Sequence, residues 1–211
     1  MFLDFKTEEI AIIFYIIIPG ILSYILVPLI KILAHKFLIL DKPNSRKIHT
    51  QPIPNVGGIS IFISFFISIF FLKHFADIDF ENLNTYLFSS LLVFLIGLID
   101  DLYNLSPLIR LISQFSITTF IWSKGINISN LNFDYLNFGE NVLKIPSIFS
   151  ILLTFFWVSG IINAINWIDG LNGLATGITI LILIGIAKIA FFKNLIGLFS
   201  ISLVLIGASL G

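Results

Sequence analysis

Apolar segments about as long as a membrane is thick recur along almost the whole chain, and they leave few folds open to it. A transmembrane helix needs about 20 mostly apolar residues, with some latitude for tilt. Such runs, separated by short polar stretches, cover residues 10–32, 57–72, 83–99, 107–122, 145–162, 174–192 and the chain from 195 onward. The sequence therefore predicts an all-α fold, a polytopic transmembrane helix bundle of about seven spans that forms a single domain over residues 1–211.

Composition excludes a water-soluble alternative. Charged residues make up 11% of the 211 residues and hydrophobic residues 57%, whereas soluble domains carry about 25% charged residues. The formal net charge is zero, so no overall field attracts nucleic acid. The chain also has no cysteine, which removes disulfides, thiolate metal ligands and cysteine nucleophiles. Membrane lipids are the expected surroundings, and the oligomeric state is left open.

Basic residues predict the orientation in the membrane. By parity, the polar stretches that follow the first, third and fifth spans lie on one side. The first of these stretches contains or adjoins Lys31, Lys36, Lys42, Arg46 and Lys47, whereas the other connectors carry at most two basic residues each. Because basic loops stay inside, this side is predicted to be cytoplasmic. We therefore expect a multi-pass protein of the inner (plasma) membrane, with its N-terminus outside and its active face in the cytoplasm.

The first polar stretch, residues 46–58, reads RKIHTQPIPNVGG. Its prolines stiffen the backbone, and its paired glycines allow a close approach to a ligand. Arg46, Lys47 and His49 are candidates for binding phosphate. The alternative is a basic flank that anchors the chain to anionic lipid head groups.

The second polar feature is the pair of adjacent carboxylates, Asp100 and Asp101, at the end of the third apolar run. Ionised carboxylates at a membrane boundary are costly, and two neighbours repel each other unless a cation neutralises them. Mg²⁺ is usually held by one or two carboxylates together with phosphate oxygens and water; one carboxylate could instead serve as a general base. The alternatives are a solvated helix end and capping of the next helix.

Arg110 and Gln114 lie four residues apart in the fourth run, so they share one face of the predicted helix. Arg110 is a candidate for binding phosphate. The alternative is that its long side chain reaches out of the membrane to the polar interface.

The third polar stretch follows the fifth run and repeats polar side chains every three residues: Asn163, Asn166, Asp169 and Asn172. This spacing would stripe one face of a helix, whereas Gly170 and Gly173 favour a loop or a broken helix. The carbonyl-bearing side chains suit recognition of a metal, a sugar or a base. A polar seam between helices is the alternative, and Asp169 is the member that fits it least.

Three motifs, in this order, carry a family resemblance: RKIHTQPIPNVGG, GLIDDLYNLSPLIRLISQ and NAINWIDGLNGLATG. Together they resemble the polyprenyl-phosphate N-acetylhexosamine-1-phosphate transferases, membrane enzymes that begin the lipid-linked assembly of cell-envelope polysaccharides. The resemblance implies transfer of a sugar 1-phosphate from a UDP-N-acetylhexosamine to a polyprenyl phosphate, with release of UMP. It also implies Mg²⁺ as the cofactor, or Mn²⁺ in its place. The His-containing first motif is most similar to that of the enzymes that use UDP-N-acetylglucosamine or a related simple sugar.

The resemblance also implies roles for individual residues. The implied catalytic residues are Asp100, Asp101 and Asp169, and the implied metal ligands are Asp100, Asp101 and Asn166. The implied substrate-binding residues are Arg46, Lys47, His49, Arg110, Asn163 and Asn172.

Two departures from the family pattern leave alternatives open. Asn172 stands where the family often has a second aspartate, which affects the expected choice of sugar donor. A further metal-binding aspartate and a His-rich loop of the family do not occur before Gly211. The chain is therefore expected to be incomplete at its C-terminus, either as a fragment or as a truncated, inactive relative. A membrane transporter or scaffold is the rival from another functional class.

Overall fold

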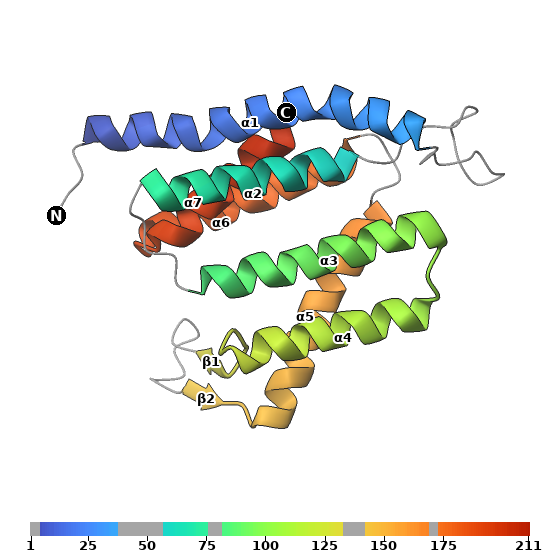
Figure 1. Cartoon of the computed structure of the whole chain (residues 1–211). Helices are drawn as coiled ribbons and strands as arrows, with labels where there is room; N and C mark the ends of the chain where they lie inside the picture. Colours follow the sequence, from blue (N-terminus) through green and yellow to red (C-terminus); the bar gives the residue numbers. More distant parts are fainter. Residues whose placement is uncertain (1–4, 38–56, 76–81, 133–141, 169–172) are drawn as a thin grey trace. The chain divides into compact units, whose positions relative to one another are not determined.

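The computed structural model describes residues 5–37, 57–75, 82–132, 142–168 and 173–211. Within these ranges the chain forms seven helices and one short hairpin (Figure 1). The helices are α1 (Phe5–Lys36), α2 (Gly57–Phe75), α3 (Leu83–Tyr103), α4 (Pro107–Ser123), α5 (Ser147–Ile168), α6 (Leu174–Phe192) and α7 (Ile196–Leu210). The strands β1 (Asn130–Asn132) and β2 (Val142–Lys144) pair antiparallel in the connector between α4 and α5.

The described chain is mostly helical, and a helix coincides with each predicted apolar run. Four helices are long and apolar enough to cross a membrane: α1 over Ile13–Lys36, α3, α5 and α6. Shorter apolar helices occur at Gly57–Lys73 and in α7. The protein is therefore integral to a membrane. The hairpin was not predicted; its strands are three residues each, too short to produce a recognisable alternation.

Two helices continue further than the apolar runs that predicted them. Helix α3 ends at Tyr103 rather than near residue 99, so both aspartates lie within its last turns. Helix α5 continues to Ile168 and includes Asn163 and Asn166. Asn163 and Asn166 of this motif therefore lie in a helix. Residues 169–172 lie outside the described residues.

The chain divides into two compact units. Unit 1 comprises α1, α2, α7 and α6 from Thr176 on, and unit 2 comprises α3, α4, the hairpin and α5.

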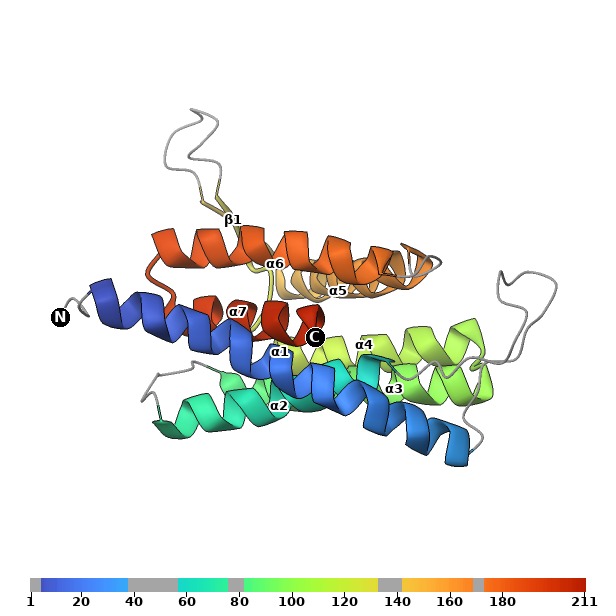
Figure 2. The ribbon, with the colours of Figure 1, turned by 90° about the horizontal axis from the view of Figure 1, so that it is seen from above.

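In unit 1, α1 packs against both α2 and α7, which also contact each other (Figure 2). Backbones approach closely where α1 meets α7. A Cβ atom built on Gly207 would overlap the carbonyl of Ile16 and lie 2.8 Å from Cγ of Pro19. Glycine at such a position lets two membrane helices come into backbone contact. Residues Ala187, Leu203 and Ile206 form an apolar cluster that joins α6 to α7.

In unit 2, α4 packs against both α3 and α5. Polar contacts anchor the end of the unit that carries the hairpin. Nε1 of Trp122 donates to Oγ of Ser150 over 3.0 Å, and the backbone N–H of Ile128 donates to Oγ1 of Thr154 over 3.1 Å. These contacts fix the register of α4 against α5, and this register determines which polar side chains meet toward the opposite end.

Candidate functional site

The turn between α3 and α4 is closed by Asp100. The N–H of Asn104, which has a left-handed backbone (φ 50°), donates to the main-chain carbonyl of Asp100 over 2.8 Å. The N–H of Leu105 donates to Oδ1 of the Asp100 carboxylate over 2.9 Å. The carboxylate at this helix end is thus stabilised by a loop N–H that would otherwise need another acceptor.

Helix α4 has its own cap. Ser106 is the N-cap, and its Oγ accepts from the N–H of Ile109 over 3.4 Å, with Pro107 in the first turn. The alternative that the aspartate pair caps the fourth helix is therefore wrong, because a serine does so.

Arg110 of α4 reaches back to α3. Its Nη1 donates to Oδ2 of Asp100 over 3.0 Å, so Leu105 and Arg110 together use both carboxylate oxygens. The side chains are 36% exposed for Arg110 and 18% for Asp100. Ion pairs this open to solvent contribute about 1 kcal/mol or less to stability. The pair therefore matters more for geometry, and a guanidinium with five N–H donors keeps several for another anion.

Gln114 lies one turn further along α4 and contacts α5. Nδ2 of Asn163 donates to Oε1 of Gln114 over 3.2 Å and to the main-chain carbonyl of Ser159 over 2.8 Å. Gln114 is 8% exposed. Two residues of α4, four positions apart, thus hold one polar side chain on each neighbouring helix.

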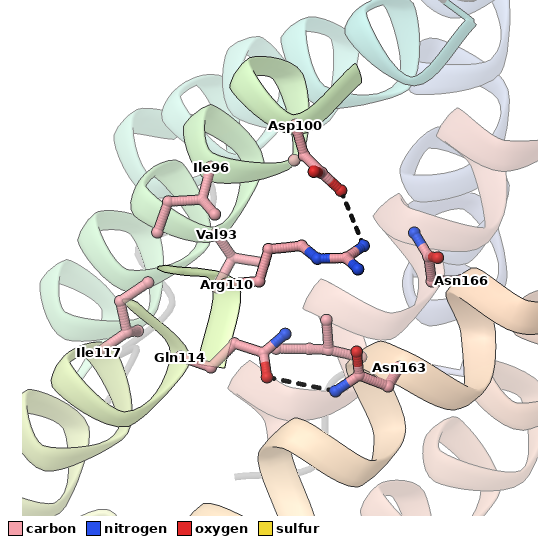
Figure 3. Close-up of a pocket in the computed structure, with 10 residues that line it drawn as sticks. Val93, Ile96, Asp100, Arg110, Gln114, Ile117, Asn163 and Asn166 are labelled. Carbon is pink, nitrogen blue, oxygen red and sulfur yellow. Dashed lines mark hydrogen bonds and ion pairs between the residues drawn. The ribbon is translucent and has the colours of Figure 1, made fainter. Parts of the chain in front are cut away.

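These side chains surround a cavity of about 110 Å³ (Figure 3). Its polar lining consists of Asp100, Arg110, Gln114, Asn163 and Asn166. Its apolar lining consists of Val93, Ile96, Gly97, Ile117 and Ile162. The cavity therefore combines one cation, one carboxylate and three amides with an apolar wall, a composition that suits a polar ligand with an apolar part.

Asp101 is placed differently from its neighbour. Successive residues of an α-helix are rotated by about 100°, and Asp101 is exposed and is not among the residues that line the cavity. The two adjacent carboxylates thus face different surroundings in this structure, although the sequence presents them as a pair.

The oxygen atoms around the cavity fit a hard cation. Among the described residues there is no group of three or more His, Cys, Asp or Glu side chains that could hold a metal by themselves. The lining offers the Asp100 carboxylate and the amide oxygens of Asn163 and Asn166. Mg²⁺ is typically bound by one or two carboxylates, with water and substrate phosphates completing its octahedron. An incomplete, all-oxygen set of protein ligands is consistent with that mode.

The structure brings together four of the predicted site residues: Asp100, Arg110, Asn163 and Asn166. The other predicted residues, apart from Asp101, lie outside the described residues: Arg46, Lys47, His49, Asp169 and Asn172. For Gln114 the sequence predicts only a shared helix face with Arg110 and no functional role. The signal that could have found it is the spacing of two polar residues one turn apart in an apolar run.

Comparisons with known proteins indicate the family of the chain. The model of glycosyl transferase family 4 matches residues 83–211, a range that includes all of the cavity. The chain is 29% identical over 211 residues to a Bacillus subtilis protein named probable undecaprenyl-phosphate N-acetylglucosaminyl 1-phosphate transferase, which covers 99% of this chain and 56% of the relative.

Two further relatives bear the name undecaprenyl-phosphate alpha-N-acetylglucosaminyl 1-phosphate transferase. The Thermotoga maritima protein is 33% identical over 174 residues, 82% of this chain and 51% of the relative. The Escherichia coli K12 protein is 33% identical over 162 residues, 76% of this chain and 42% of the relative. The chain thus spans about half the length of the curated relatives that it matches. The family match covers well over half of the chain, and the chain belongs to glycosyl transferase family 4.

Proposed function

We propose that the full-length protein transfers N-acetylhexosamine 1-phosphate from a UDP-sugar to a membrane polyprenyl phosphate and releases UMP. N-acetylglucosamine is the proposed sugar, because the names of the relatives specify it. An oxygen of the lipid phosphate would attack the sugar-bearing phosphorus of the donor, and the bond of that phosphorus to the UMP oxygen would break. The product is a sugar diphosphate lipid, which would begin the assembly of a cell-envelope polysaccharide.

The observation that carries this proposal is the cavity of unit 2, where a carboxylate, a guanidinium and amides meet beside an apolar wall. Phosphoryl transfer depends mainly on positioning the reactants and offsetting their negative charge. Arg110 keeps N–H donors for a phosphate oxygen while its Nη1 holds Asp100. The amide of Asn163 would orient the sugar nucleotide by hydrogen bonds.

Mg²⁺, the proposed cofactor, would neutralise the pyrophosphate and polarise the bond that breaks. Mn²⁺, a second divalent cation that accepts oxygen ligands, could replace it. Asp100 and Asn166 of the cavity lining would hold the ion, and Asp169, outside the described residues, is a further proposed catalytic carboxylate. Asp101, which is exposed, is the proposed acceptor of the proton from the lipid phosphate. Arg46, Lys47, His49 and Asn172 remain proposed ligands of the substrates.

The proposed placement of this chemistry is the cytoplasmic face of the inner (plasma) membrane. A cytoplasmic face gives access to a water-soluble UDP-sugar, and the membrane itself supplies the lipid acceptor. The basic residues between α1 and α2 support this orientation, because basic loops stay inside. In this proposed orientation the N-terminus lies outside, and each of the seven helices is a membrane span.

The test uses membranes from cells that express the complete coding sequence. Release of UMP from UDP-N-acetylglucosamine is measured with added polyprenyl phosphate, with and without a chelator. We expect the chelator to stop UMP release and added Mg²⁺ to restore it. Asp101→Asn is expected to lower the rate at least about 100-fold, as for loss of a general base.

UMP release that persists at the full rate in the chelator, or in the Asp101→Asn protein, would contradict the proposal. Absence of UMP release from any UDP-sugar would favour an inactive relative, a transporter or a scaffold. A transporter would carry polar side chains at mid-membrane depth along several spans.

A further inference from the structure

The orientation of the Asn163 amide is set by the backbone of its own helix. Ser159, one turn earlier in α5, presents its main-chain carbonyl oxygen 2.8 Å from the Asn163 amide. A carbonyl oxygen can only accept a hydrogen bond, so the amide atom beside it must be the nitrogen, Nδ2. The chemistry of this contact therefore excludes the flipped amide.

Gln114 takes the second hydrogen of the same amide. The distance from Nδ2 of Asn163 to Gln114 is 3.2 Å, and the atom of Gln114 that accepts must be its oxygen, Oε1. Both hydrogens of the Asn163 amide are now used, one within α5 and one toward α4. Its oxygen, Oδ1, is left for the cavity that both residues line (Figure 3).

We propose that Gln114 is a positioning residue, which holds the Asn163 amide so that Oδ1 accepts a hydrogen bond from an N–H or O–H group of the UDP-sugar. This inference rests on the proposed function. Gln114 is suited to the role because it is nearly fully buried, so the acceptor it offers to Asn163 is held by packing. Without Gln114, the Asn163 amide would keep one of its two anchoring hydrogen bonds and would turn more freely.

The expected effect is on binding of the sugar donor. A neutral hydrogen bond contributes about 0.5–1.5 kcal/mol, which corresponds to about a two- to thirteenfold change in affinity. Gln114→Met preserves the size of the side chain and removes its acceptor. We expect this variant of the full-length protein to raise the KM for the UDP-sugar about fivefold, within that range, with a smaller change in kcat.

The decisive experiment is a double-mutant cycle with Gln114→Met, Asn163→Ala and the combined variant, in the UMP-release assay. If Gln114 acts through Asn163, Gln114→Met has no further effect once Asn163 is alanine. Thr118→Val is the matched control. Thr118 lies one turn beyond Gln114 on α4, is fully buried, and has a hydroxyl without a hydrogen-bond partner in the described part of the chain. It does not line the cavity, so its replacement should leave KM and kcat unchanged.

Additive effects of the two substitutions, or an unchanged KM in Gln114→Met, would overturn the inference. A shift of the Mg²⁺ half-saturation in place of the KM for the sugar would also overturn it, because Asn163 would then face the cation. A wild-type protein without UMP release would contradict the proposed function instead. The same cycle measured on the thermal unfolding midpoint would then decide the contact itself: coupled shifts support it, and additive shifts overturn it.

Discussion

Hydroxyls in both units donate to carbonyls of their own helix, and unit 2 adds hydrogen bonds between helices. In unit 1 the hydroxyls of Ser60, Ser64 and Ser202 donate to main-chain carbonyls of their own helices. In unit 2 polar side chains reach from one helix to another: Arg110 to Asp100, Asn163 to Gln114, and Trp122 to Ser150. Hydrogen bonds within one helix do not constrain the position of the neighbouring helix, which shape complementarity then determines. Hydrogen bonds between helices fix the register of one helix against the other.

The close approach of α1 and α7 belongs to the first kind of packing. Small residues allow the two backbones to touch, and dispersion contacts then hold the helices together. In unit 2 the α4 helix instead supplies two polar side chains that align α3 and α5 around the cavity. The difference indicates that unit 1 is built for close packing and unit 2 for placing chemical groups.

Arg110→Met tests the role of unit 2 with the largest expected effect. The substitution removes the cation of the cavity and leaves the Asp100 carboxylate with Leu105 alone. We expect UMP release by the full-length protein to fall about 100-fold, which is about 2.7 kcal/mol of transition-state free energy. Stability should change by less than about 1 kcal/mol, because the ion pair is partly exposed to solvent.

The control for this prediction is Lys124→Met, which removes a cation at the opposite end of α4. Lys124 does not line the cavity, so UMP release should stay near the wild-type rate. Equal losses in the two variants would mean that charge on α4, rather than the cavity, matters.

Gly207→Ala tests the close packing of unit 1. The added methyl group would overlap the carbonyl of Ile16, a backbone atom that cannot turn aside. We expect a loss of about 2 kcal/mol in the free energy of unfolding in detergent, as for overpacking of a tight core. Gly185→Ala on α6 is the control, because its methyl group meets nothing within 4 Å. The control should be neutral or stabilising by up to about 1 kcal/mol, and an equal loss in both proteins would refute the close approach.

Ser150→Ala tests a bond between helices. Ser150 is 2% exposed and accepts from Nε1 of Trp122, so its removal leaves a partly buried N–H without that acceptor. We expect about 1 kcal/mol of destabilisation, measured as thermal unfolding of the detergent-solubilised protein. Trp122→Phe in the Ser150→Ala background should add little beyond the lost ring area. Independent effects of the two substitutions would argue against the contact.

Ser64→Ala is the same substitution in unit 1 and should have the smallest effect. Ser64 is fully buried, but its hydroxyl donates within α2, to the carbonyl of Ile61. Alanine favours the helix, and no partner on another helix loses a bond, so we expect a change below about 0.5 kcal/mol. A loss as large as that of Ser150→Ala would remove the distinction between the two units.

Several features could be read from the residues alone. Apolar runs predicted the positions of the helices, because a membrane core accepts little else. The motifs around Asp100 and Asn163 indicated the family, and the family match confirms it. The hairpin was missed because its strands are too short to show a period, and the extensions of α3 and α5 were missed because polar residues end an apolar run before they end a helix.

The sequence by itself determined that this is a helical membrane protein and which family it belongs to. It also showed which polar side chains are energetically unfavourable at a membrane boundary and are therefore candidates for a function. It did so because hydropathy and residue type act locally and can be counted along the chain. Only the tertiary structure decided which of those side chains line the cavity and which contact one another. Asp100 and Asp101 are neighbours in sequence, yet only Asp100 lines the cavity, where it is held by Arg110 and Leu105. Asn163 and Gln114 are 49 residues apart, yet they share one hydrogen bond. The rotation and register of packed helices decide such pairings, and neither can be read from a single helix.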